Sequence, residues 1–205
     1  MNDCLARNHK KYNWMIFFEL DEFIFLKNYL NVKDFLKEKK FDKCNLIYLN
    51  GIVHTDNDLV YYENKSLFER FPNPIKINKN TKLAVKYILR GNISTKITAI
   101  HLCCEIKHKC NGFGYFNSTY GIYAKQPDNL YYYYDHFYSK STEEFINKLT
   151  RGDSWKMDEK YILHKIDKYF KYNRITEQKI LMIENATNYD LIKFKKKLNL
   201  NYKIL

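Results

Sequence analysis

The chain has 205 residues, enough for a domain with its own hydrophobic core, and no segment has the length of a membrane span or the pattern of a signal peptide, so a cytoplasmic protein is expected. Lysine and arginine outnumber aspartate and glutamate by 35 to 23, a formal net charge of +12, and aromatic residues make up 17%. Basic and aromatic side chains together would suit nucleic-acid binding, but the basic residues are spread along the chain, which argues against a nucleic-acid-binding protein. Contact with the inner, anionic face of a membrane remains open.

The first predicted element is a buried strand over residues 15–18, MIFF, which runs directly into Glu19, Asp21 and Glu22. Residues i and i+2 of an extended chain share a face, so Glu19 and Asp21 are expected to converge on a divalent cation, Mg²⁺ or Mn²⁺. Glu22 would then point away and brace the site. The alternative is a strand that leaves the core and meets solvent, where acidic residues are common.

The middle of the chain predicts alternating helices and strands. Asn31 can cap a helix over residues 32–40, and residues 44–54 form a strand that a turn connects to a returning strand at 59–62. Shorter strands are expected at residues 82–88, 98–103, 121–124 and 130–134.

The last third of the chain predicts helices. Residues 141–144, STEE, form a capping box for a helix that ends near Arg151. Further helices are expected at residues 158–170, 176–186 and 190–198. The sequence therefore predicts one α/β domain followed by a helical tail.

Five cysteines are present, an odd number without a CxxC pair: Cys4, Cys44, Cys103, Cys104 and Cys110. The spacing of the last three, with the nearby histidines, fits no common structural zinc site. We expect free core cysteines in a reducing compartment.

The segment WMIFFELDEF at residues 14–23 resembles the W-(I/V)-x-F-x-D-x-D-E-F motif of glycosyltransferase family 92. Four further matches follow in family order: FERF at 68–71, KLAVK at 82–86, IH at 100–101, and YDHFYSKSTEEF at 134–145 with Lys148 and Arg151-Gly152 continuing it. NVKDFL at 31–36 is similar to the short helix that follows the first motif. The resemblance covers residues 12–153.

The resemblance implies a GT-A-like (Rossmann-like) mixed sheet flanked by helices. Residues 1–153 would be the C-terminal portion of such a domain, and residues 154–205 a helical extension packed on it. The chain departs from the family in two ways: Glu19 stands where members usually have Asp, and only about thirteen residues precede the motif, where members carry a nucleotide-binding half.

The resemblance also assigns candidate site residues. Glu19, Asp21 and His136 would hold the metal. Lys140 and Ser141, at a helix start where anions bind, would contact the donor phosphate. Arg70 and His101 are further candidates for substrate contact, grouped with the donor site, although a structural role for Arg70 and an acceptor-side position for His101 are open. Four residues are candidates for the general base, and the sequence does not choose among them: Asp56, Asp58, Asp135 and Asp153.

The implied function is metal-dependent transfer of a sugar from a nucleotide diphosphate sugar to a glycan or glycolipid acceptor, with Mn²⁺ or Mg²⁺ as cofactor and galactose as the first expected sugar. One alternative is a non-catalytic fragment, or a partner subunit whose missing half comes from a second chain. Another is a basic nucleic-acid-binding module. The sequence leaves the acceptor and the linkage open.

Overall fold

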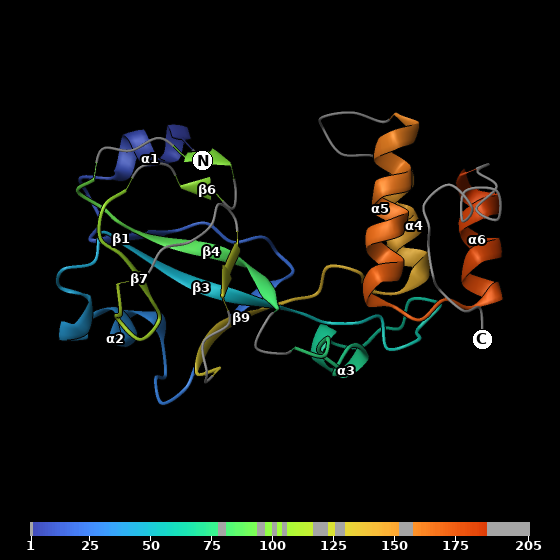
Figure 1. The fold of residues 1–205 in the computed structure, drawn as a ribbon, viewed down its shortest axis with the longest axis horizontal. Coiled ribbons are helices and arrows are strands. Elements are labelled where there is room, and N and C mark those ends of the chain that lie inside the picture. The colour runs from blue at the N-terminus through green and yellow to red at the C-terminus, as the bar shows by residue number, and fades with distance from the viewer. Residues whose placement is uncertain are drawn as a thin grey trace. The chain divides into compact units, whose positions relative to one another are not determined.

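The structure is a computed structural model that describes residues 2–77, 81–93, 97–99, 102–103, 106–116, 123–125, 130–151 and 158–187 (Figure 1). The chain divides into two compact units. The first unit comprises Met1–Ile52 and Lys76–His136, and the second comprises Val53–Ile75 and Phe137–Leu205. This division does not coincide with the expected boundary at residue 153, because residues 137–151 pack with the later helices.

The first unit contains a seven-stranded mixed sheet whose central path has the order β1-β4-β3-β9-β2. These strands are β1 (Trp14–Ile16), β2 (Glu22–Leu26), β3 (Leu46–Val53), β4 (Lys82–Arg90) and β9 (Tyr132–His136). β7 (Lys109–Asn111) pairs with β3 in parallel, and β8 (Tyr123–Lys125) pairs with β4 antiparallel. A separate pair consists of β5 (Ile97–Ala99) and β6 (Leu102–Cys103).

Helices cover both faces of this sheet: α1 (Asn2–Asn8) lies on one face, and α2 (Val32–Leu36) lies on the other with a 3-10 turn at Lys39–Phe41 (Figure 1). Alternate residues of β3 point to opposite faces. Leu46 and Tyr48 therefore join a core with Leu5 of α1, whereas Ile47 and Leu49 join a core with Phe35 of α2. This architecture confirms the expected fold class, a partial GT-A-like mixed sheet flanked by helices.

The second unit contains four described helices: α3 (Leu67–Arg70), α4 (Thr142–Arg151), α5 (Glu159–Tyr172) and α6 (Glu177–Thr187). Apolar residues at helical spacing form its core: Phe145, Leu149, Leu163, Ile166, Tyr169, Phe170 and Ile183. The predicted cap at Ser141 is present, because its side chain accepts a hydrogen bond from the backbone N–H of Glu144. Asp158, which was not predicted as a cap, accepts one from the N–H of Tyr161 at the start of α5. Within the described ranges, no helix is long and apolar enough to cross a bilayer.

The expected strand at residues 59–62 is wrong. The backbone carbonyls of Leu59 and Val60 instead accept hydrogen bonds from the N–H groups of Thr142 and Glu143. These N–H groups lie in the first turn of α4, where the helix itself offers them no acceptor. The helix expected at residues 32–40 is shorter than predicted, although Asn31 caps it as expected. Strands β2 and β7 and helix α3 were not anticipated, and the helix expected at 190–198 lies outside the described residues.

Cys44 and Cys110 form a disulfide between fully buried side chains, with Cα atoms 5.8 Å apart. The expectation of free cysteines is therefore wrong for this pair. β7 brings Cys110 opposite Ile47, close to the start of β3, which sequence spacing did not indicate. Disulfides persist mainly in oxidising compartments, in contrast with the reducing setting expected from the sequence. Cys4 is an exposed free thiol.

Candidate metal centre

The backbone turns sharply between β1 and β2, at Leu20 and Asp21. The N–H of Glu22 donates a hydrogen bond to the carbonyl oxygen of Glu19 at 3.2 Å, which closes the turn. Residues 19–22 are therefore not extended, and the rule that i and i+2 share a face does not apply to Glu19 and Asp21. The turn instead places Glu19 next to Glu22.

Strand pairing adds a histidine to these two carboxylates. β2 pairs antiparallel with β9, and Glu22 lies directly opposite His136. Glu19, Glu22 and His136 each offer one ligand atom, and these atoms lie within 4.8 Å of one another. The structure thus brings together two of the three predicted ligands, with Glu22 as the third member of the group. Asp21 lies in the turn, half-buried, and is not in this group.

A buried lysine from β4 holds the two carboxylates. The Nζ atom of Lys86 lies 3.0 Å from Oε2 of Glu19 and 3.0 Å from Oε2 of Glu22. The side chains of Lys86 and Glu22 are fully buried, whereas that of Glu19 is 46% exposed. The backbone N–H of Glu19 also donates to Oε2 of Glu22 at 2.9 Å. Oε2 of Glu22 thus has two partners, the ammonium group of Lys86 and the backbone N–H of Glu19.

The other oxygen of Glu22 supports a cation site. Oε1 is buried and has no hydrogen-bond partner among the described residues. Nδ1 of His136 lies 3.9 Å from this oxygen, which is beyond hydrogen-bond distance. A buried polar atom without a partner costs free energy, and a bound ion would remove that cost. Two carboxylates and an imidazole are also a donor set that suits Mn²⁺, so the residues fit the implied metal.

The two glutamates differ in their acid–base behaviour. Burial raises the pKa of Glu22 above its ordinary value, and this outweighs the opposing effects of the Glu19 N–H and of Lys86. Burial acts in the same direction on Glu19, but the hydrogen bond from Lys86 and the charges of Lys86 and His136 outweigh it, so the pKa of Glu19 is lowered. The cluster therefore pairs a half-exposed carboxylate that ionises readily with a buried one that holds its proton more firmly.

The residues predicted as candidates for the general base differ from one another in their surroundings. The Asp56 carboxylate is buried in the second unit and accepts hydrogen bonds from Tyr169 at 2.6 Å and from Lys179 at 2.7 Å. Asp58 accepts from the same lysine at 3.2 Å. These bonds occupy Asp56 in joining its loop to α5 and α6. Asp135 is buried on β9, and Asp153 lies outside the described residues.

The donor-site candidates gather near the start of α4, except His101, which lies outside the described residues. Nη1 of Arg70 bonds Oε2 of Glu144 at 2.6 Å, and buried Ser141 completes a capping box with Glu144. The N–H groups of Thr142 and Glu143 already donate hydrogen bonds to the backbone carbonyls of residues 59 and 60. A phosphate at this helix start would have to compete with those contacts. Lys140 is half-buried in a left-handed backbone conformation, with φ of 53°.

Sequence reasoning missed the role of two residues in the cluster. The sequence predicts that Glu22 points away from Glu19, but the turn at residues 20–21 interrupts the alternation of an extended strand. Lys86 lies in the KLAVK segment, for which the sequence predicts no chemical role. A lysine between the apolar residues 83–85 and 87–89 of β4 was the available signal, because a buried ammonium group needs a nearby anion.

Comparison with protein families gives one finding. Residues 1–164 match the model of glycosyltransferase family 92. The match includes the carboxylate–histidine cluster and ends within α5, so α6 lies beyond it. A comparison with curated proteins found no match.

Proposed function

Because the chain belongs to glycosyltransferase family 92 and is a glycosyltransferase enzyme, we propose that it transfers a sugar from a nucleotide diphosphate sugar in a metal-dependent reaction. The observation that carries this proposal is the convergence of Glu19, Glu22 and His136 around a carboxylate oxygen that has no hydrogen-bond partner among the described residues. Such a donor set would hold Mn²⁺ or Mg²⁺.

The side chains of the cluster have separate roles in this proposal. Glu19, Glu22 and His136 hold the ion, and Asp21 remains a candidate ligand from the sequence motif. When bound, the ion would neutralise the diphosphate and make it a better leaving group. Lys86 keeps both carboxylates in position from the buried side and balances part of their charge.

The substrates are proposed from the family resemblance. Uridine diphosphate galactose is the first donor to test, and the acceptor is a glycan or a glycolipid. Lys140 is the candidate for contact with the donor phosphates. The general base that removes the acceptor proton stays open, although the bonds of Asp56 to Tyr169 and Lys179 make it a poor candidate.

Calorimetry with Mn²⁺ alone, and then with uridine diphosphate galactose, tests the proposal. We expect the wild-type chain to bind the donor only with the metal, and Glu22→Gln to weaken Mn²⁺ binding at least tenfold. Asp42→Asn, which removes an exposed carboxylate elsewhere in the first unit, is the matched control and should bind as the wild type does. Asp21→Asn shows whether the motif aspartate is a ligand as well.

The same experiment separates the catalytic and non-catalytic hypotheses. A folded wild-type chain that binds neither Mn²⁺ nor the donor would overturn the proposal and favour a partner subunit without its own donor site. Equal Mn²⁺ affinity in Glu22→Gln and Asp42→Asn would show that the ion, if bound, lies elsewhere.

A further inference from the structure

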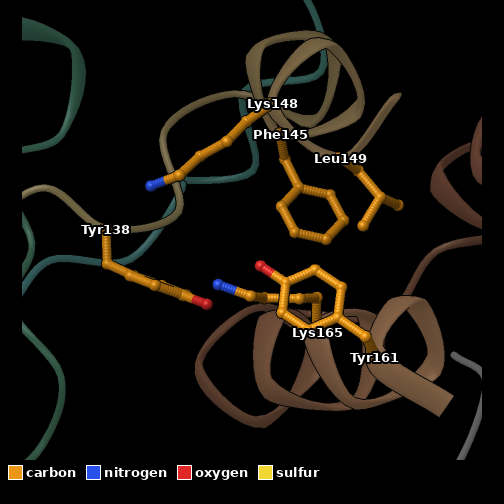
Figure 2. A pocket seen from close by; sticks show the side chains of 6 residues that line it. All are labelled: Tyr138, Phe145, Lys148, Leu149, Tyr161 and Lys165. Carbon is orange, nitrogen blue, oxygen red and sulfur yellow. The ribbon is translucent and has the colours of Figure 1, made fainter. Parts of the chain in front are cut away.

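The second unit has a hollow between α4 and α5 (Figure 2). It encloses about 20 Å³, which is room for one water molecule and too little for a sugar ring. Its lysines lie over tyrosine rings, with Lys148 at 5.3 Å from the centroid of Tyr138 and Lys165 at 5.0 Å from that of Tyr161. This hollow therefore offers no ligand site comparable with the carboxylate–histidine cluster of the first unit.

Another buried polar atom lies on the same face of the sheet as that cluster. It is the hydroxyl oxygen of Tyr134, a fully buried residue of β9, and it has no hydrogen-bond partner in the part of the chain that the structure describes. Tyr134 and His136 are two positions apart on β9, so they share a face, and their ring centroids are 6.2 Å apart. On the neighbouring β2, Ile24 is opposite Tyr134 and Glu22 is opposite His136. The hydroxyl group and the cluster therefore occupy one region of the sheet.

A glycine on β3 admits the ring of Tyr134 to this region. A Cβ atom at Gly51 would lie 2.4 Å from both the Cζ atom and the hydroxyl oxygen of Tyr134, closer than nonbonded atoms can approach. Gly51 follows Leu49 by two positions, and Leu49 is opposite Lys86 on β4, so Gly51 faces the same side as the lysine that holds the carboxylates. Glycine weakens the interior of a strand, so its presence here indicates that the close approach of the phenol matters.

The Tyr134 hydroxyl group is within the electrostatic influence of the two glutamates. Burial raises the pKa of Tyr134 above its ordinary value, and the charges of Glu22 and Glu19 raise it further. The phenol is therefore neutral at physiological pH. A neutral phenol can donate one hydrogen bond and accept others, and burying it without a partner costs free energy.

We propose that Tyr134 is a positioning residue of the metal centre, and that its hydroxyl group hydrogen-bonds a water molecule in the hydration shell of the bound cation. Cations such as Mg²⁺ keep several waters when a protein supplies few ligands, and side chains beside the ligands orient them. A hydrated ion would then give a partner both to Oε1 of Glu22 and to the Tyr134 hydroxyl. This inference rests on the metal centre of the proposed function and deepens it by naming a residue that the ion needs beyond its ligands.

Calorimetry on the full chain with Mn²⁺ alone tests the inference. Tyr134→Phe removes the hydroxyl group and keeps the ring, which packs edge-on against Phe18. We expect this variant to bind Mn²⁺ about tenfold to hundredfold more weakly. Water-proton relaxation should also show faster water exchange at the bound Mn²⁺, because one water is no longer held by the hydroxyl group. Tyr133→Phe removes a hydroxyl group from the opposite face of β9 and should bind Mn²⁺ as the wild type does.

Stability without metal separates this role from a structural one. The Tyr134 hydroxyl makes no hydrogen bond with the described residues, so removing it should leave the melting temperature in EDTA unchanged or raise it. A clearly lower melting temperature of Tyr134→Phe in EDTA would show that the hydroxyl group supports the fold itself, and it would overturn the inference.

The binding data give further outcomes. Equal Mn²⁺ affinity of Tyr134→Phe and Tyr133→Phe, with a wild type that binds both Mn²⁺ and the donor, sinks this inference alone. An effect of Tyr134→Phe that appears only after uridine diphosphate galactose is added would assign the hydroxyl group to the donor phosphates and overturn the contact with water. A wild type that binds Mn²⁺ with the expected loss in Tyr134→Phe, but binds no donor, sinks the proposed function alone. A wild type that binds no Mn²⁺ sinks both.

Discussion

At the scale of single residues, the charge balance of the carboxylate cluster rests on Lys86. Its ammonium group is fully buried and lies 3.0 Å from a carboxylate oxygen of each glutamate. Without Lys86, the buried Glu22 would lose its only described ion pair with a lysine. Removing one partner of a buried ion pair usually costs more than the pair contributes, because the remaining charge is left uncompensated.

We predict that Lys86→Met lowers the free energy of unfolding by about 3–5 kcal/mol. Urea denaturation at neutral pH measures this, with Lys76→Met, which removes an exposed lysine of the first unit, as the control. Adding Glu22→Gln to Lys86→Met should restore part of the lost stability, since it removes the uncompensated charge. A cost below about 1 kcal/mol for Lys86→Met, as for a surface ion pair, would contradict this account.

At the scale of elements, the start of α4 combines a cap and an ion pair. Glu144 accepts from Arg70 and from Ser141, and these contacts hold α3 and α4 together. Burial alone would raise the pKa of Glu144, but the hydrogen bonds from Arg70 and Ser141 outweigh it and lower the pKa below the ordinary 4.5. The ionised form is therefore favoured by folding.

This shift predicts a pH dependence of stability. A carboxylate with a lowered folded-state pKa stabilises the protein fully above its unfolded-state pKa, and the contribution disappears as pH falls through the folded-state value. Glu144→Gln should cost about 2 kcal/mol at pH 7, because Arg70 is buried and loses a charged partner. The difference from wild type should shrink below pH 4.5.

Urea denaturation at pH 7, 5, 4 and 3 measures that difference. Glu159→Gln, which neutralises an exposed carboxylate at the start of α5, is the control and should show a small difference at every pH. If the difference in free energy of unfolding between Glu144→Gln and wild type stays constant from pH 7 to pH 3, the ion pair with Arg70 does not explain the stability of this region.

At the scale of the whole molecule, the disulfide is the longest-range covalent constraint among the described residues. Cys44 and Cys110 are 66 positions apart, and their bond joins the start of β3 to β7 within a buried core. A cross-link over a loop of this length restricts the unfolded chain and stabilises the folded one.

We predict that Cys44→Ala/Cys110→Ala lowers the free energy of unfolding by about 4 kcal/mol relative to the oxidised chain. Peptide mapping under non-reducing conditions should find the two cysteines linked, and dithiothreitol should destabilise the wild type but not the double variant. Cys4→Ala, which removes the exposed free thiol, is the control. Absence of the linked peptide from oxidised protein would contradict the disulfide.

The sequence itself determined the features that depend on near neighbours. Short apolar segments located β3 and β4, and the capping residues Asn31 and Ser141 located the starts of helices, because each of these signals acts within a few positions of the chain. The motif residues in family order also identified glycosyltransferase family 92, and the family match confirms this.

Only the tertiary structure decided which side chains meet. Glu22 joins Glu19 because a turn replaces the expected extended chain, and His136 joins them because β9 pairs with β2 across more than a hundred residues of sequence. Lys86 and the Cys44–Cys110 bond likewise depend on strands that pair at long range. Local propensity carries no information about such pairings, because the burial of whole faces of the sheet selects them.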